Sequence, residues 1–207
     1  MLIVKAKTPA RGREDRQARI LQNIGLVLLL LALGFWLQGA YIFVKAELGQ
    51  YLIKRAWQHS LLTGAEHKPW LWADTWPVAR IQVPSRDINQ VVLAGDSGQA
   101  LAFGPGHTSS SAQPGADGVV VISGHRDTHF GFLQNLREGE AIILQNWEGQ
   151  HTVYRVSSRQ VVDEDVLITS NNNVRSLMLV TCWPFDSSVP NPRQRFIVYA
   201  QAVDAFF

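Results

Sequence analysis

The chain has 207 residues, enough for one domain of ordinary size with an appendage. Hydrophobic residues make up 46% and charged residues 17%, a composition that excludes a disordered or fibrous chain. The formal net charge is +2, but residues 1–49 carry seven basic and three acidic side chains, which leaves the rest of the chain slightly negative. Because the basic charge lies in an N-terminal arm, nucleic acid is not an expected partner.

Residues 24–44 read IGLVLLLLALGFWLQGAYIFV and contain no charge. As a helix this stretch is about 31 Å long, close to the thickness of a bilayer core. The basic arm before it, residues 1–23, is expected to stay in the cytoplasm, so that everything after Lys45 is exported. A buried core helix and a cleavable signal peptide are the alternatives, and the signal peptide would also export the domain. The sequence predicts an uncleaved transmembrane anchor at 24–44.

Residues 45–76 connect this anchor to the rest of the chain. Apolar residues near helical spacing predict an amphipathic helix that ends at Gly64 and either packs on the domain or lies on the membrane surface. The expected apolar face consists of Leu48, Tyr51, Leu52, Ala56, Trp57 and Leu61. The linker 65–76 is rich in Trp, and its function cannot be read from the sequence.

From residue 77 onward, short β-type runs alternate with Gly, Pro, Asn, Asp and Ser, which predicts an all-β sandwich or barrel. The expected strands are Val78–Val83, Gln90–Leu93, Gly118–Ser123, Ala141–Asn146, Thr152–Val162, Leu177–Cys182 and Phe196–Val203. Short helical turns are expected at Ala100–Phe103 and Phe130–Leu136.

The only cysteine, Cys182, excludes an intramolecular disulfide and any metal site built from several cysteines. It follows an apolar run, and Pro184 cannot donate to a strand ladder, so Cys182 is expected at a strand end. A cysteine in such a run is more often a small buried hydrophobe. An exported domain without disulfides, however, has little reason to keep an exposable thiol unless it reacts.

His125 also follows an apolar strand, after the flexible Gly124. Alone, it would be read as an ordinary loop histidine. His129, four residues later, suggests a metal pair, but that spacing aligns two rings only in a helix, and the strand before Gly124 argues against one. No third ligand is evident, and no metal is expected.

Arg193 and Arg195 open the last predicted strand, where period-2 geometry puts both on one face, opposite Phe196 and Val198. A solvated strand start is the ordinary reading of such residues. Taken with Cys182 and His125, however, a strand-end arginine completes a set of nucleophile, proton partner and oxyanion stabiliser. A neighbouring cation also favours the reactive thiolate.

Three blocks resemble the signature blocks of sortases, the cysteine transpeptidases of bacterial surfaces: GVVVISGHRDTHFGFLQNLREGEAIIL, LMLVTCWPF and RQRFIVYA. The upstream VLAGDSGQALAFGPGH is similar to the segment before the sortase histidine block. Order, composition and spacing agree over residues 78–203. The TCWPF form and the single anchor resemble the sortases of Gram-negative (proteobacterial) bacteria most closely.

The resemblance implies a mainly β fold: an eight-stranded sortase-type β-barrel with short helices at 77–207, preceded by one transmembrane helix. It implies a thiol peptidase that cleaves an LPXTG-like C-terminal sorting signal between Thr and Gly through a thioacyl-enzyme. The product would be transferred to an amine acceptor, with no cofactor. The implied location is the cytoplasmic (inner) membrane, with the domain on the periplasmic side.

By the same resemblance, His125, Cys182 and Arg195 are the catalytic residues. Arg195 is preferred over Arg193 because the family arginine directly precedes an apolar triplet. Neighbouring Thr181, Arg193 and Trp183 are expected to support the site or the substrate. Some sortases bind calcium through acidic loops, a role that could be offered to 163–165, although a solvated turn is the preferred reading of Asp163, Glu164 and Asp165.

Two other classes of function stay open at this point. One is a non-catalytic, membrane-anchored β-barrel that binds peptides or acts as a scaffold. The other is a metal-dependent hydrolase on His125 and His129. Intact His, Cys and Arg blocks favour the transpeptidase.

Overall fold

The computed structural model of the chain describes residues 11–163, 175–187, 189 and 192–203. It divides into two compact units between Glu47 and Leu48. The sequence places the start of the domain at residue 77, but the second unit already begins at Leu48. The reason is that the last turns of the long helix and the segment 64–76 pack on the barrel.

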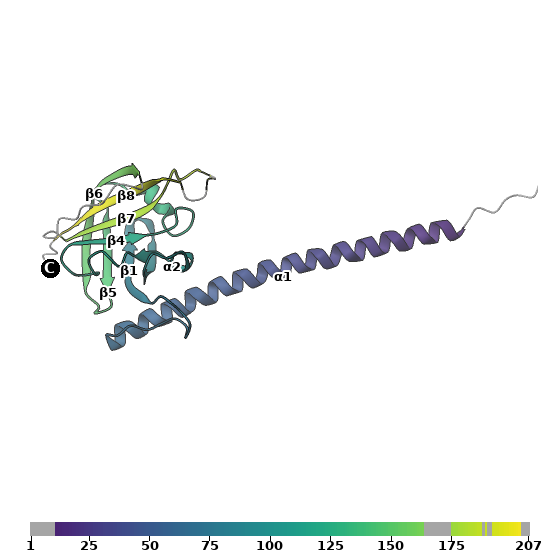
Figure 1. Cartoon of the computed structure of the whole chain (residues 1–207), viewed down its shortest axis with the longest axis horizontal. Helices are drawn as coiled ribbons and strands as arrows, with labels where there is room; N and C mark the ends of the chain where they lie inside the picture. The colour runs from purple at the N-terminus through teal and green to yellow at the C-terminus, as the bar shows by residue number, and fades with distance from the viewer. Residues whose placement is uncertain (1–10, 164–174, 188, 190–191, 204–207) are drawn as a thin grey trace, which may run out of the picture. The chain divides into compact units, whose positions relative to one another are not determined.

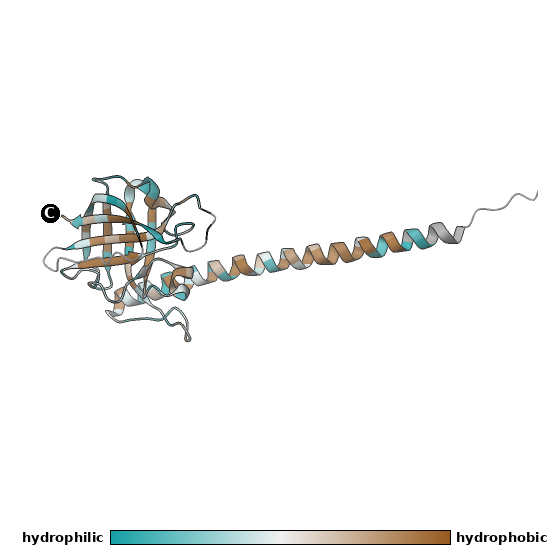
Figure 2. Ribbon diagram, turned by 45° about the horizontal axis from the view of Figure 1, so that its top comes forward, coloured by the Kyte–Doolittle hydropathy of each residue, from teal (hydrophilic) through white to brown (hydrophobic). Residues whose placement is uncertain are grey.

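Helix α1 (Arg11–Thr63) is a single uninterrupted helix. Its large apolar side chains between Ile24 and Val44 are at least half exposed, and Figure 2 shows the apolar residues concentrated along its middle. Among the described residues it is the one helix long and apolar enough to cross a membrane, which by itself is weak evidence of a span. The helix ends where the sequence predicts, because Gly64 adopts a left-handed φ of 64° and its N–H bonds to the carbonyl of Ser60.

The end of α1 that belongs to the second unit buries only part of the expected apolar face. Leu48 and Tyr51 of the expected apolar face are exposed, whereas Ala56 and Trp57 of that face are buried. The buried positions follow the i, i+4, i+7, i+8, i+11 pattern of one helix face and are Gly49, Ile53, Ala56, Trp57 and Ser60. Small Gly49 belongs to this face because the Phe103 ring lies against it, 3.2 Å from where a Cβ would stand.

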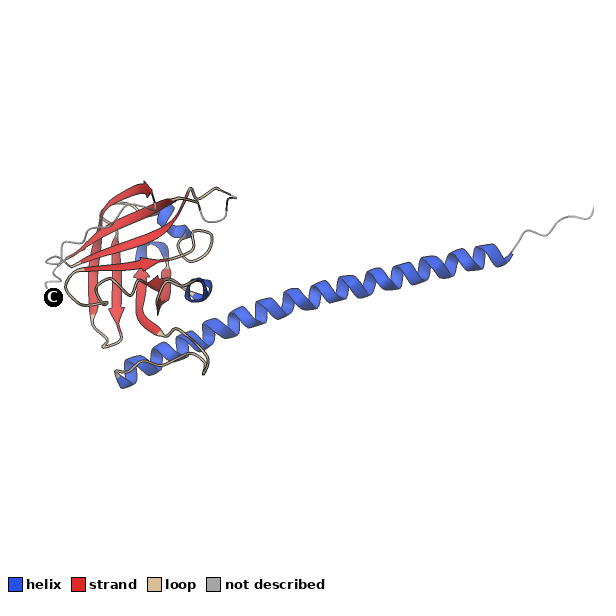
Figure 3. Ribbon diagram, in the orientation of Figure 1, coloured by secondary structure: helices blue, strands red, loops and turns tan. Residues whose placement is uncertain are grey.

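Eight strands form a closed barrel in the order β1-β2-β3-β4-β7-β8-β6-β5, which confirms the predicted fold class (Figures 1 and 3). Their bounds are β1 Pro77–Val83, β2 Ile88–Ala94, β3 Gly106–His107, β4 Val119–Ser123, β5 Ala141–Asn146, β6 His151–Asp163, β7 Ser176–Trp183 and β8 Gln194–Ala202. Short helices are η1 (Pro84–Arg86), α2 (Gly98–Phe103) and η2 (Gly131–Asn135). The sequence missed β3, since two residues are too few to show alternation.

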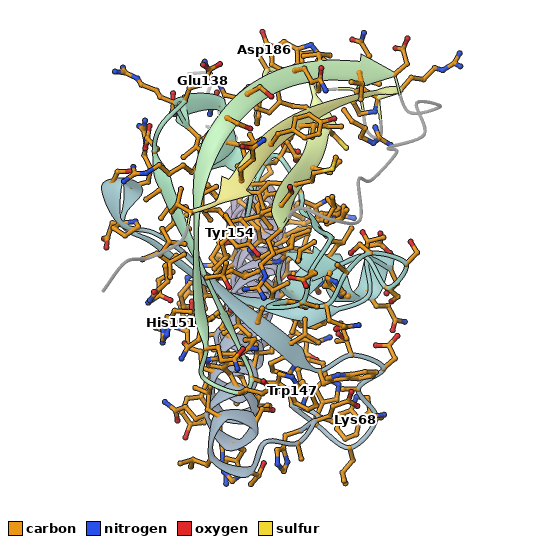
Figure 4. All side chains as sticks on the ribbon, turned by 90° about the vertical axis from the view of Figure 1, so that its left-hand side faces the viewer. Lys68, Glu138, Trp147, His151, Tyr154 and Asp186 are labelled. Carbon is orange, nitrogen blue, oxygen red and sulfur yellow. The ribbon has the colours of Figure 1, made fainter. Side chains whose placement is uncertain are left out.

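The strands β4, β7 and β8 are neighbours and carry apolar residues on both faces. Their inward side chains join the main core, whose centre includes Tyr154, seen inside the barrel in Figure 4. A second apolar cluster covers their outer face: Val119, Met178 and Ile197 are buried, and Val121, Val162, Val180 and Tyr199 are half-buried. These three strands therefore carry apolar residues on their outer face up to the barrel end where β4 and β7 finish.

Candidate active site

Cys182 and Arg195 are direct cross-strand partners in the antiparallel β7–β8 pair. Two positions before Cys182 on β7 is Val180, and two positions after Arg195 on β8 is Ile197, and both belong to the outer apolar cluster. Because side chains alternate along a strand, the thiol and the guanidinium share that outer face. Cys182 is a free cysteine of intermediate exposure. The predicted position of the thiol at a strand end is confirmed.

His125 reaches the same end of the barrel from β4. The parallel β4–β7 register ends with Ser123 opposite Val180, and the N–H of Gly124 continues it by donating to the carbonyl of Val180 at 3.0 Å. His125 is therefore two residues past Ser123, as Cys182 is two residues past Val180. The order β4-β7-β8 brings the histidine and the arginine to the two sides of the cysteine strand.

The Thr181 side chain stabilises the junction of β4 and β7 from the barrel interior. Its buried hydroxyl donates to the carbonyl of Gly124 at 2.7 Å, a bond between residues 57 positions apart. Thr181 thus faces the barrel interior, opposite Cys182, and holds the backbone that carries His125. We propose that Thr181 supports the site indirectly, because its hydroxyl positions the backbone next to His125.

Gly124 is required by close packing. A Cβ at this position would stand 2.7 Å from the ring of Phe130, which is fully buried, so no larger residue fits without displacing that ring. The chain then turns, with the N–H of Phe130 donating to the carbonyl of His125 at 2.9 Å. The Gly-His pair therefore places an exposed imidazole on a backbone held by the core.

His129 is half-buried and lies close enough to His125 for the two rings to interact electrostatically. Burial lowers the pKa of His129, and the positive charge of His125 lowers it further. Its carbonyl accepts a hydrogen bond from the Gln90 amide at 3.0 Å. In the part of the chain that the structure describes, no three His, Cys, Asp or Glu side chains gather to hold a metal ion. Of the acidic turn considered for calcium, Asp163 ends β6, whereas Glu164 and Asp165 lie outside the described residues.

Trp183 points away from the thiol. Its ring stacks on Phe196 with centroids 5.7 Å apart and meets Phe185 edge-on at 5.6 Å, and it packs on the main core. The alternation that directs Cys182 outward directs Trp183 inward. Trp183 is therefore not placed to contact a substrate on the face that carries Cys182. The ring instead anchors the end of β7.

Arg193 and Arg195 differ in their local structure. Arg195 is on β8 and half-buried, and one Nη atom donates to the carbonyls of Pro192 and Gln194. Arg193 precedes the strand in a bend and is exposed. The sequence-based expectation that strand alternation places both on one face does not apply, because β8 begins at Gln194.

Sequence reasoning missed Arg126, the residue after His125. Its side chain is buried and its guanidinium donates to three carbonyls beyond the cysteine strand: Pro184 at 2.7 Å, Ser187 at 2.5 Å and Val189 at 3.2 Å. It also pairs with the exposed Asp127 at 3.0 Å. Arg126 ties the segment after Cys182 to the segment of His125. The only sequence signal was an arginine beside a candidate catalytic histidine, which does not reveal burial.

We expect Arg126→Gln to lower the free energy of unfolding by about 2–3 kcal/mol, because hydrogen bonds from a buried charged group are lost. It should also lower kcat for the peptide cleavage that the sequence predicts at least tenfold, because the segment after Cys182 is no longer held to the segment that carries His125. Thermal melts and cleavage rates, both measured well below the melting temperature of the variant, test this. Arg155→Gln is the matched control, because Arg155 is exposed and donates to one carbonyl, that of Gly139. Equal effects of the two changes would contradict the role of Arg126.

Comparison with known proteins agrees with this geometry. Residues 81–203 match the family model of the sortase domain. Sortase D of Bacillus subtilis is 33% identical over 125 residues, which are 59% of this chain and 62% of that protein. The match therefore spans less than two thirds of the curated relative's length.

Solved structures give the same result. Sortase A of Listeria monocytogenes is 25% identical, with a TM-score of 0.54 over 61% of this chain and 87% of that one. Sortase C-1 of Actinomyces oris is 26% identical, with a TM-score of 0.56 over 61% and 74%. The sortase D5 transpeptidase of Clostridium perfringens, at 19% identity, shares the fold, with a TM-score of 0.58 over 75% and 96%. With the family model covering more than half of its length, this chain belongs to the sortase family.

Proposed function

We propose that this protein is a membrane-anchored cysteine transpeptidase that uses Cys182, His125 and Arg195. The observation that carries the proposal is the meeting of these residues at one end of three adjacent strands, with Cys182 and Arg195 in direct register. A thiol, an imidazole and a guanidinium are the groups that thioester formation needs: nucleophile, proton carrier and oxyanion donor. Membership of the sortase family supports the same assignment.

In the proposed reaction the Cys182 thiolate attacks the carbonyl carbon of the scissile peptide bond and forms a tetrahedral oxyanion. Arg195 donates hydrogen bonds to that oxygen. The intermediate collapses to a thioester as the C–N bond breaks, and His125, as imidazolium, gives its proton to the leaving amine. An incoming amine then attacks the thioester, neutral His125 takes its proton, and the thiolate leaves. The thiolate and imidazolium are both restored.

We propose an exported protein with an LPXTG-like C-terminal signal as the substrate, cleaved between Thr and Gly. The half-buried outer-face residues Val121 and Val180 precede His125 and Cys182 on their strands and offer apolar contacts to an extended peptide. Arg193 lies exposed beside β8, where it can contact the substrate or acceptor. The TCWPF sequence and single N-terminal apolar helix support assignment to the Gram-negative subtype.

The test is a transpeptidation assay with the full-length protein in detergent. A peptide carrying an LPXTG signal between a fluorophore and a quencher is incubated with and without an amine acceptor. We expect cleavage, a mass for the Thr–acceptor amide, and a covalent acyl-protein on Cys182 when the acceptor is omitted. A protein that binds the peptide without forming the acyl adduct would instead support the scaffold function.

We propose that α1 anchors the protein in the cytoplasmic membrane with the barrel on the periplasmic side. The uncharged 24–44 segment and the basic residues before it support this orientation. A reporter active only in the cytoplasm, fused after Phe207, should give no signal, and a periplasmic reporter at the same site should be active. A strong cytoplasmic signal would refute the topology.

A further inference from the structure

A pocket of about 450 Å³ opens at the end of the barrel opposite Cys182 and has no role in the chemistry above. Figure 4 shows Trp147, one of its lining residues, at the other end of the barrel from Asp186, which is four residues past Cys182. The walls of the pocket come from the linker before β1, the start of β1, the 113–116 turn and the β5–β6 turn. Its volume is within the range of pockets that bind small molecules.

Hydrogen bonds and close packing fix the walls of this pocket. The buried Asn146 side chain donates to Gln150 Oε1 at 3.2 Å and accepts from the Gln150 N–H at 2.9 Å, which closes the β5–β6 turn. Gly115, with a φ of 94°, lies so close to this turn that a Cβ would stand 2.7 Å from Asn146 Nδ2. At the start of β1, the carbonyl of Trp76 accepts from the Ala94 N–H at 2.8 Å. The pocket is therefore preformed, and a ligand that enters it pays little for ordering the protein.

Two indole rings line the pocket without belonging to the core. Trp76 and Trp147 are half-buried, but neither packs on a hydrophobic core cluster of the described residues. Neither ring contacts another aromatic ring in the part of the chain that the structure describes. Trp70 and Trp183, by contrast, each pack on a core cluster. The core therefore does not account for Trp76 and Trp147, whose rings are available to a ligand.

The pocket is also acidic. Glu66 and Glu148 line it from two different walls, and no described Lys, Arg or His side chain does. Both glutamates are exposed, and within the described residues neither has a hydrogen-bond or ion-pair partner. Indole rings attract cations through their π faces, and carboxylates form charge-assisted hydrogen bonds with ammonium and guanidinium groups. The lining therefore has the chemistry of a site for an organic cation.

We propose that this pocket binds an organic cation carried on an apolar stem, such as the guanidinium of arginine or the ammonium of lysine. Trp76 and Trp147 contact the stem and the cation, and Glu66 and Glu148 neutralise the charge. Because the pocket and Cys182 lie at opposite ends of the barrel, this binding is separate from the proposed acyl transfer.

The test measures binding to the full-length protein in detergent, with isotope-labelled tryptophan so that each indole N–H gives its own NMR signal. The probe is Nα-acetyl-arginine amide, and its control is Nα-acetyl-citrulline amide, which has nearly the same shape but no charge. Trp→Phe changes assign the signals. We expect the signals of Trp76 and Trp147 to shift and saturate with a Kd at least tenfold lower for the arginine derivative. Trp72, which is 83% exposed and outside the lining, should not respond.

Two glutamine substitutions test the carboxylates. Glu66→Gln combined with Glu148→Gln should raise the Kd of the arginine derivative at least fivefold. Glu138→Gln is the matched control, because Glu138 is also exposed but lies at the other end of the barrel (Figure 4), and it should leave the Kd unchanged. Since all three side chains are exposed, thermal melts of the variants should match that of the parent.

A blocked pentapeptide with a central arginine distinguishes the two sources of such a cation. Binding as tight as that of the amino-acid derivative indicates a side chain of a protein partner, whereas binding at least tenfold weaker indicates a free small cation. Both results retain the cation site. Equal Kd values for the arginine and citrulline derivatives, an unchanged Kd in the double glutamine variant, or no response of Trp76 and Trp147 at tens of millimolar would overturn it.

Discussion

Cys182→Ala should abolish cleavage and transpeptidation of a sorting-signal peptide and leave the melting temperature within about 1–2 °C of the parent. The thiol supplies the atom that forms the thioester, so no other group in the site can replace it. Cys182 is only half-buried at the end of β7, so the loss of one sulfur removes little packing. Turnover of the fluorescent peptide and a thermal melt measure the two effects.

Ser176→Ala is the matched control for this change. Ser176 is on the same strand and, six residues before Cys182, on the same face, so the change also removes one heteroatom from β7. It should retain full activity. If Cys182→Ala keeps turnover, the nucleophile is another group. If it unfolds, Cys182 is a core residue and the proposed chemistry loses its main support.

Arg195→Ala should lower the rate of acylation at least a hundredfold, whereas Arg193→Ala should lower it less than tenfold. Arg195 is on β8, opposite Cys182, where the core residues Phe196 and Val198 hold the strand, so its donors are preorganised. Removing one such oxyanion donor costs typically about 2.7–4 kcal/mol. Arg193 is exposed in a bend before the strand. Single-turnover rates of both variants on one peptide measure the difference.

Arg195→Lys separates charge from geometry. A lysine keeps the charge but lacks the planar, rigid set of donors, so it should recover only a small part of the lost rate. Melting curves of all three variants should agree within a few degrees. A larger loss for Arg193→Ala than for Arg195→Ala would transfer the proposed oxyanion role to Arg193.

The class of fold and the position of Cys182 at a strand end could be predicted from local sequence alone. The uncharged 24–44 stretch is apolar in any context, and β runs bounded by turn residues predict a barrel or sandwich without knowledge of their partners. The His125, Cys182 and Arg195 blocks are each recognisable because strand ends and reactive side chains coincide within a few residues. The end of α1 just before Gly64 could be predicted equally well, because it depends on the backbone conformation of that one glycine.

The relations between these blocks were decided only by the tertiary structure. Alternation predicts the faces of one strand, but the register that sets Cys182 opposite Arg195 depends on hydrogen bonds between strands distant in sequence. The inward direction of Trp183 and the burial of Arg126 beneath the segment after Cys182 follow from that packing. For the same reason the second unit buries Ile53 and exposes Tyr51: an amphipathic helix with apolar residues on several sides takes its buried face from the surface it meets.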